Sequence, residues 1–97
     1  MILKYHLSIA FTAYNSAKNL NMQFKRIFAE CDNEKFKNFL EIVISDNCSK
    51  DNTRKVVNFF IRKSRQKKNI TIKYYRNKKN LGFSRNFIKL IKLVNAK

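Results

Sequence analysis

A chain of 97 residues is long enough for one small domain, or for part of a larger one, and too short for two. Hydrophobic residues make up 44% of it, and one glycine with no proline excludes collagen-like, proline-rich and flexible-linker sequences. The formal net charge of +16 favours polyanionic partners: nucleic acid, an anionic membrane surface or phosphorylated small molecules. A bias toward Lys, Asn and Ile in an A+T-rich genome explains the same charge without any anionic partner.

Cysteine and histidine are too scarce for most metal and disulfide chemistry. Cys31 and Cys48 do not make a disulfide framework, and no Cys/His cluster has the spacing of a zinc site. His6 is the only histidine, so no nucleophile–His–acid set can be assembled. The sequence has no apolar run of the ~18–20 residues that a membrane span needs. A reduced, cytoplasmic setting fits these features best.

The apolar pattern predicts strands and helices in alternation. Strands are predicted at residues 7–11, 40–45 and 70–75. The first helix follows the polar turn 12–16, and its apolar residues recur at spacings of three and four: Ala17, Leu20, Phe24, Ile27, Phe28 and Cys31. The second helix has a basic face opposite an apolar one made of Val56, Val57, Phe60 and Ile61. The third helix follows the polar loop 76–82 and is predicted to turn four apolar residues inward: Phe87, Ile88, Ile91 and Val94.

This alternation predicts an α/β fold with three βα units of a doubly wound parallel sheet, a Rossmann-like half-domain. Both gaps between the predicted strands are long enough for a right-handed crossover. The first two strands are apolar on both faces, as expected when helices cover both sides of a sheet. The sequence ends inside an apolar helix with no following strand, so we expect residues 1–97 to be the N-terminal part of a single, truncated domain.

Three polar segments follow the three predicted strands, at residues 12–15, 46–53 and 77–86. Ligands of open parallel α/β sheets bind outside the carboxyl ends of the strands, so these segments are the candidate site. Asp46 ends a buried strand in a chain with six acidic residues, where a carboxylate can accept an N–H group from a nucleobase. An ordinary capped turn is the alternative for the residues that follow it, Ser49, Asp51 and Thr53.

Each of the other candidates has a functional and a structural interpretation. Tyr14 either stacks on a planar base or is a half-buried aromatic residue of the turn. Thr12 can form a hydrogen bond to a base. Asn15 is a further candidate, or a cap of the first helix. The single glycine, Gly82, provides either a positive φ or a close backbone approach. Arg85, near a helix start, is a candidate partner for a phosphate or a solvated surface arginine.

No Gly-x-Gly-x-x-Gly sequence follows the first strand and no Gly-Lys-Ser/Thr phosphate loop occurs, which argues against dinucleotide dehydrogenases and nucleoside triphosphatases. Three segments instead resemble, in order and spacing, the N-terminal half of a family 2 glycosyltransferase of GT-A fold: LSIAFTAYN (7–15), EIVISDNCSKDNT (41–53) and YYRNKKNLGFSRNF (74–87). The resemblance covers nearly the whole chain.

The resemblance implies an enzyme that transfers a sugar from a nucleotide-diphosphate donor, a UDP-sugar, to a surface-glycan or lipid-linked acceptor. It implies a nucleotide-sugar site made of Thr12, Tyr14, Asn15, Asp46, Asn47 and Arg85. Thr12 and Tyr14 match the positions that line the nucleobase pocket. Asn47 stands where many members have the second residue of an acidic pair, so its amide is expected to bind the base more weakly than a carboxylate. Arg85 matches a basic residue near the diphosphate.

The family's metal-binding Asp-x-Asp sequence is absent, because no Asp or Glu follows Asp51. The resemblance implies that the full-length enzyme uses a divalent metal, Mn or Mg, to offset the charge of the diphosphate, and that this chain alone binds none. No catalytic residue is assigned, and the 97 residues alone are expected to be inactive. We expect an apolar strand ending in paired acids within roughly fifteen residues after Lys97 of a longer chain.

The alternative function is that of a small basic α/β module that binds nucleic acid, supported by the +16 charge. The basic residues are spread over every predicted helix rather than gathered in a stripe, so no nucleic-acid partner is expected. Peripheral contact with the inner face of a membrane is compatible with a lipid-linked acceptor. Tight oligonucleotide binding with a steep salt dependence would favour the alternative.

Overall fold

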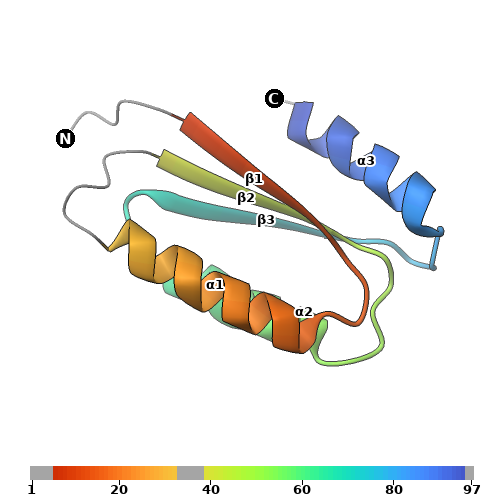
Figure 1. Cartoon of the computed structure of the whole chain (residues 1–97), viewed down its shortest axis with the longest axis horizontal. Helices are drawn as coiled ribbons and strands as arrows, with labels where there is room; N and C mark the ends of the chain where they lie inside the picture. Colours follow the sequence, from red (N-terminus) through yellow and green to blue (C-terminus); the bar gives the residue numbers. More distant parts are fainter. Residues whose placement is uncertain (1–5, 33–38, 96–97) are drawn as a thin grey trace.

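The computed structural model describes residues 6–32 and 39–95. Within them, three strands alternate with three helices in the predicted order (Figure 1). The elements are β1 (His6–Ala13), α1 (Ala17–Cys31), β2 (Phe39–Asp46), α2 (Thr53–Ser64), β3 (Ile70–Arg76) and α3 (Phe83–Asn95). The strands extend beyond their predicted bounds by at most two residues, because main-chain pairing continues past the predicted ends.

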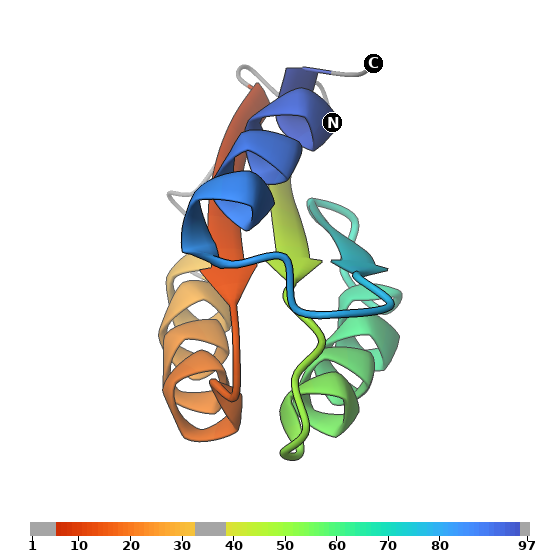
Figure 2. The same cartoon turned by 90° about the vertical axis from the view of Figure 1, so that its right-hand side faces the viewer.

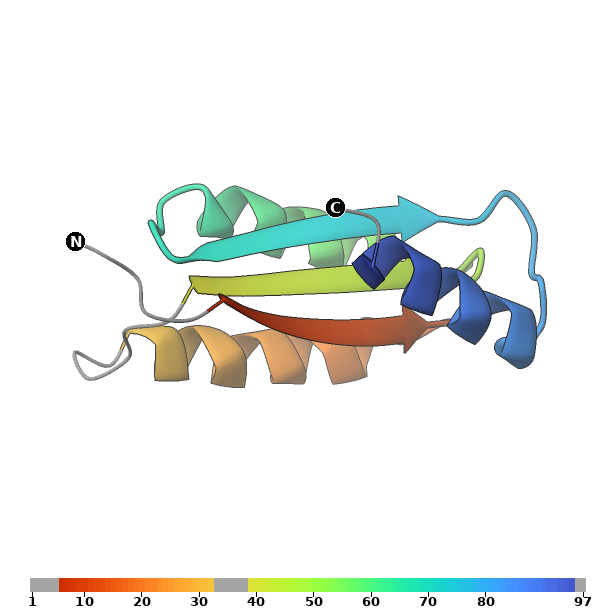
Figure 3. The same cartoon turned by 90° about the horizontal axis from the view of Figure 1, so that it is seen from above.

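The described strands form one parallel sheet in the order β1-β2-β3. The chain moves from β1 to β2 to β3 in one direction across the sheet. Two crossovers of the same handedness in that direction place their helices, α1 and α2, on the same face of the sheet. The third helix, α3, lies on the opposite face and packs over β1 and β2 (Figures 1, 2 and 3). The prediction of a Rossmann-like half with helices on both faces is confirmed.

The main core fills the space between the sheet and the helices α1 and α2. In the central strand β2, every residue from Leu40 to Asp46 is buried. Phe60 of α2 is 1% exposed, and its ring stacks on that of Phe24 of α1 with the centroids 4.7 Å apart. Apart from Ala17, all the apolar residues predicted for the first two helices lie in this core or pack against it.

The prediction that β1 is covered on both faces holds only in part: α3 packs on one face, and Ile9 and Phe11 pack against the core on the other, but the strand stays partly exposed. Among the described strands β1 has only β2 as a neighbour, and it therefore forms an edge of the sheet. Several of its side chains are therefore exposed: Leu7 is 44% exposed, and Ala10 is also exposed. An apolar strand sequence predicts burial, but the position of the strand in the sheet decides how much of it is covered.

The prediction for α3 is wrong for three of its four apolar residues, since only Val94 is partly buried. Phe87, Ile88 and Ile91 are between 45% and 53% exposed, whereas Asn86 and Leu90 are buried. The two buried residues are four apart and lie on one face of the helix, which is the face that contacts the sheet. The apolar residues of α3 spread over a wider arc than this contact covers. No helix in the described part of the chain is long and apolar enough to cross a membrane.

Candidate nucleotide site at the carboxyl edge of the sheet

The carboxyl ends of the strands meet at one edge of the sheet, as expected for parallel topology. Ala13 at the end of β1 pairs with Asp46 of β2, which pairs with Arg76 of β3. Pairing continues past the strand ends, because the Asn47 N–H donates to the Ala13 carbonyl oxygen at 2.8 Å. The Asn77 N–H likewise donates to the Asp46 carbonyl oxygen at 2.8 Å. The three polar segments therefore begin side by side.

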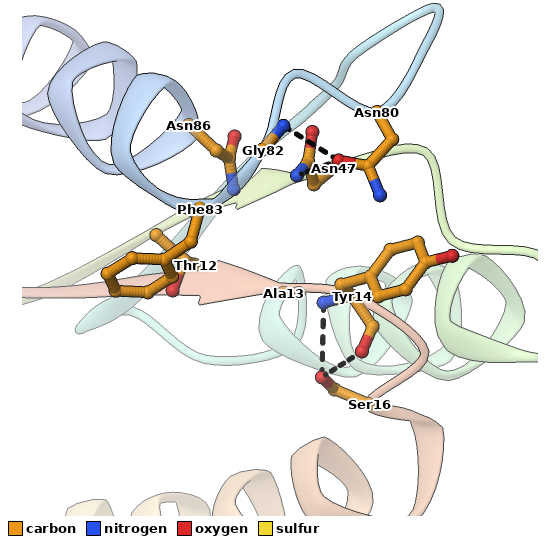
Figure 4. Close-up of a pocket in the computed structure, with 9 residues that line it drawn as sticks. All are labelled: Thr12, Ala13, Tyr14, Ser16, Asn47, Asn80, Gly82, Phe83 and Asn86. Atoms are coloured by element: carbon orange, nitrogen blue, oxygen red, sulfur yellow. Dashed lines mark hydrogen bonds between the residues drawn. The ribbon is translucent and has the colours of Figure 1, made fainter.

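A pocket of about 420 Å³ opens at this edge, between the segment after β1, the end of β2 and the start of α3 (Figure 4). Its lining residues come from all three segments: Thr12, Ala13, Tyr14, Ser16, Asn47, Asn80, Gly82, Phe83 and Asn86. None of these side chains is charged. Of the residues predicted to bind a nucleotide sugar, the structure brings together Thr12, Tyr14 and Asn47.

Two aromatic rings line the pocket: that of Tyr14, which follows β1, and that of Phe83, which begins α3. Tyr14 is 46% exposed, and its turn is held by two hydrogen bonds with Ser16. The Tyr14 N–H donates to Ser16 Oγ at 3.2 Å, and the Ser16 hydroxyl donates to the Tyr14 carbonyl oxygen at 3.1 Å (Figure 4). Phe83, at the first position of α3, is 71% exposed and contributes the second ring. The pocket therefore combines polar side chains with two aromatic rings.

Asp46 lies behind the pocket rather than in it. Its side chain is fully buried and does not line the pocket. Its Oδ1 accepts hydrogen bonds from the N–H and the hydroxyl of Ser49, and its Oδ2 accepts one from the Tyr74 hydroxyl. The expected acceptor for a nucleobase is therefore turned inward, with internal donors on both of its oxygens. Contact between Asp46 and a base stays a prediction.

The Tyr74 hydroxyl remains protonated and is the donor in its hydrogen bond with Asp46. Burial, the hydrogen bond to Asp46 and the negative charge of that carboxylate together raise the pKa of Tyr74 well above its ordinary value of 10. The hydroxyl therefore keeps its proton at neutral pH. The Asp46–Tyr74 hydrogen bond joins the end of β2 to β3 behind the site.

Asn47 holds the third polar segment against β2. Its Nδ2 donates to Asn80 Oδ1 at 2.7 Å, and its Oδ1 accepts the Leu81 N–H at 2.7 Å. Asn80 Oδ1 also accepts the Gly82 N–H at 2.8 Å. Gly82 has a φ of +82°, and a Cβ built there would meet nothing within 4 Å. Glycine is therefore needed for its left-handed backbone and not for a close approach.

Asn80 and Asn86 have no individual role predicted from the sequence, yet both line the pocket. Asn86 is 2% exposed, and its Oδ1 accepts the Ser45 hydroxyl at 2.7 Å and Asn77 Nδ2 at 2.8 Å. Its Nδ2 donates to the Ser45 carbonyl oxygen at 3.0 Å. These bonds fix the start of α3 on the end of β2. The sequence pattern held no signal for Asn86, because the predicted inward face of this helix did not include Leu90, which lies four residues later on the buried face.

Asn15 joins the first two polar segments and does not cap α1. Its backbone has a φ of +48°, and its N–H donates to Ser49 Oγ at 2.8 Å. Its Oδ1 accepts the N–H of Lys50 at 2.8 Å. Asn15 does not line the pocket, so its assignment to the nucleotide-sugar site stays a prediction. Ser49 is likewise tied to Asp46 and Asn15 and caps no helix.

Asp51 serves the N-termini of two helices. Its Oδ1 accepts the Thr53 N–H at 2.9 Å, and its Oδ2 accepts the Ala17 N–H of α1 at 3.1 Å. Desolvation raises the pKa of Asp51, but the hydrogen bonds from the Thr53 hydroxyl, the Thr53 N–H and the Ala17 N–H together outweigh it and lower the pKa below 3.8. Asp51 is the N-cap residue of neither helix, since Asn52 and Ser16 hold those positions, but its carboxylate accepts the first N–H of both.

Arg85 is exposed in the first turn of α3 and does not line the pocket. Its contact with a diphosphate therefore stays a prediction. Among residues 6–32 and 39–95, no group of three or more His, Cys, Asp or Glu side chains could hold a metal ion.

The model of the family described as Glycosyl transferase family 2 matches residues 8–97. This span runs from β1 to the end of the chain and contains all three polar segments. The chain belongs to glycosyltransferase family 2. A search of curated proteins found no match. The match covers the N-terminal part of the family domain, and family 2 enzymes carry out glycosyl transfer from a nucleotide-sugar donor to an acceptor.

Proposed function

We propose that the pocket at the carboxyl ends of β1 and β2 binds the nucleoside diphosphate of a UDP-sugar for glycosyl transfer. One observation carries this proposal: Thr12, Tyr14 and Asn47, from segments far apart in the sequence, line one pocket in a family 2 domain. The volume of about 420 Å³ is in the range of small-molecule and cofactor sites.

The base is expected to lie against Tyr14. Nearly half of that side chain is exposed, so a planar base can stack on the ring. Asn47 Oδ1 already accepts two hydrogen bonds, from Leu81 N–H and Asn77 Nδ2, whereas its Nδ2 donates one, to Asn80. The remaining amide hydrogen of Nδ2 can donate to a carbonyl oxygen of uracil. Recognition through this hydrogen replaces the acceptor that a carboxylate would offer.

The diphosphate is expected to lie toward the start of α3. Gly82 and Phe83 line the pocket, so the N-terminus of α3 forms part of its wall. The first-turn N–H groups of a helix and the positive end of its dipole favour an anion. The first turn of α3 contains no acidic residue, and no carboxylate lines the pocket to repel phosphate. Arg85 in the same turn is the proposed second contact.

The proposed acceptor is a surface glycan or a lipid-linked glycan, with the protein in the cytoplasm or at the inner face of the membrane. The side chains in the described part of the chain do not fit a divalent cation, since they include no cluster of metal-ligating groups. No step is therefore assigned to a metal here, and use of Mn or Mg by the full-length enzyme stays a prediction.

A titration with UDP followed by NMR tests the proposal. UDP should shift the backbone amide signals of Thr12, Tyr14 and Asn47 in a saturable way. Tyr14→Ala should weaken UDP binding by about 1–3 kcal/mol, the range for stacking of a base on an aromatic ring. Tyr75→Ala is the matched control, because Tyr75 is 39% exposed on β3 and outside the pocket.

Equal affinities of the two tyrosine variants for UDP would contradict the proposal, as would UDP shifts that avoid the pocket. Tighter binding of oligonucleotides, increasing with their length and falling steeply with salt, would favour the nucleic-acid alternative instead.

A further inference from the structure

A second polar pocket lies between α2 and β3 and shares no residue with the nucleotide pocket. Its volume is about 370 Å³, and four side chains line it: Arg54, Asn58, Tyr74 and Arg76. Arg54 and Asn58 are four apart on α2 and therefore lie on one helical face. Tyr74 and Arg76 are two apart on β3 and lie on one face of the sheet. Because α2 packs on β3, these two faces meet.

The pocket gathers positive charge without a lining carboxylate to offset it. In the described part of the chain, neither Arg54 nor Arg76 forms an ion pair. Arg76 Nη2 donates to the Ser49 carbonyl oxygen at 3.0 Å, which orients the guanidinium and leaves its other N–H groups for a ligand. The carboxylate behind Tyr74, that of Asp46, is fully buried and already accepts the Tyr74 hydroxyl.

Arg54 and Arg76 line one pocket with Tyr74, and their charges act on its hydroxyl. Burial and the bonded Asp46 carboxylate raise the pKa of Tyr74, and the charges of Arg76 and then Arg54 partly counteract that rise. Both positive charges therefore border the pocket that Tyr74 lines. Like charges at close range repel, and a bound anion between them would relieve the repulsion.

We propose that this pocket binds a phosphate group, either as the free ion or on a small phosphorylated molecule. Arg54 and Arg76 are its paired donors, and the Asn58 amide is a third. A guanidinium presents planar N–H groups that match phosphate oxygens, so two of them on adjoining elements favour a phosphate over a monovalent anion. The site stays accessible when a nucleotide occupies the pocket beside Tyr14.

The test is an NMR titration of the 97-residue chain with inorganic phosphate, in the absence and presence of saturating UDP. Phosphate should shift the signals of Arg54, Asn58 and Arg76 in a saturable way, and UDP should not displace it. Arg54→Gln should weaken phosphate binding by about tenfold, the loss of one charge-assisted pair of hydrogen bonds. Arg62→Gln is the matched control, because it removes the same charge from an exposed arginine of α2 outside the pocket.

Arg62→Gln should change the phosphate affinity by less than about twofold, since long-range charge effects are screened by salt. Equal weakening by Arg54→Gln and Arg62→Gln would overturn the proposal, because it would indicate diffuse attraction to a basic surface. Shifts at Tyr14 that UDP abolishes would overturn it too, by placing the anion in the nucleotide pocket.

A second variant tests the proposal even if the Arg54→Gln protein fails to fold. Asn58→Asp adds a carboxylate at an exposed lining position and should abolish phosphate binding, while UDP shifts at Tyr14 remain. Retained phosphate affinity in a folded Asn58→Asp protein would overturn the proposal. Tyr14→Ala should leave phosphate binding unchanged, so the proposals for the phosphate pocket and for the nucleotide pocket can be refuted separately.

Discussion

At the scale of single residues, the carboxylate of Asp46 organises the turn that leaves β2. It accepts the Ser49 N–H at 3.0 Å, three residues ahead, and thereby closes a turn in which Cys48 has a φ of +63°. A non-glycine residue in the left-handed region is strained and persists only where its surroundings impose it. Asp46 imposes it here through Ser49, and it anchors Tyr74 of β3 at the same time.

Asp46→Ala should lower the free energy of unfolding by about 2–3 kcal/mol, because it leaves buried donors on Ser49 and Tyr74 without their charged acceptor. Chemical denaturation monitored by circular dichroism measures this loss. The control is Asp32→Ala, since the Asp32 carboxylate is exposed and pairs with Lys67 at the surface. That pair is worth about 0–1 kcal/mol. Equal stability of the Asp46 variant and the wild type would show that Asp46 is free for a ligand.

At the scale of elements, one carboxylate links the two helices on the same face of the sheet. Asp51 precedes α2 and accepts the N–H of Thr53, but it also accepts the N–H of Ala17, the first residue of α1. The Thr53 hydroxyl in turn donates to Asp51, and Thr53 Oγ1 accepts the Ser16 N–H at 2.8 Å. The N-termini of α1 and α2 are thus held together beside the nucleotide pocket, which Ser16 lines.

Asp51→Ala should cost about 1–2 kcal/mol of stability, the range for loss of an N-cap. Since the pKa of Asp51 is lower in the folded protein than its ordinary 3.8, its charge stabilises the fold above that pH. The stabilisation declines as the pH falls below 3.8 toward the native pKa, because the unfolded chain binds the proton more readily. Denaturant unfolding of wild type and variant at several pH values checks both points.

The difference in stability between wild type and Asp51→Ala should shrink as the pH is lowered from about 5 to 3. Asp51→Asn is the companion variant, because it keeps an acceptor oxygen but has no charge to titrate. A difference that stays constant over this pH range would contradict the charged capping role.

At the scale of the whole molecule, a strongly positive surface coexists with an exposed apolar stripe on α3. Phe83, Phe87, Ile88 and Ile91 are each at least 45% exposed, and the rings of Phe83 and Phe87 stack with centroids 6.0 Å apart. Exposed apolar surface of this kind favours association. The net charge of +16 opposes it between identical chains, because the copies repel one another.

We therefore expect self-association of the 97-residue chain to increase with ionic strength, since salt screens the repulsion and leaves the apolar attraction. Sedimentation velocity at rising protein and salt concentrations measures it. Ile88→Gln should reduce the association, whereas Met22→Gln, at a 42% exposed position on α1, should not. Association that falls as salt is added would identify charge pairing instead of the α3 stripe as its cause.

The sequence by itself determined the order of strands and helices, the parallel sheet and the edge at which the pocket opens. These follow from local information: apolar residues at periods of two and 3.6 define the elements, and short βα connections leave parallel pairing as the outcome. The same reasoning placed Thr12, Tyr14 and Asn47 at one site, because residues that follow parallel strands must meet at the carboxyl edge.

Only the tertiary structure decided which side chains at that edge are available to a ligand. Asp46 and Tyr74 are 28 residues apart and Asp51 and Ala17 are 34 apart, so nothing in either local sequence predicts these bonds. The sequence likewise did not determine which face of α3 is buried, because the apolar residues of this helix spread over a wider arc than the face that packs on β1 and β2. Which polar groups become internal partners depends on where donors from distant elements arrive, and packing of the whole chain sets that geometry.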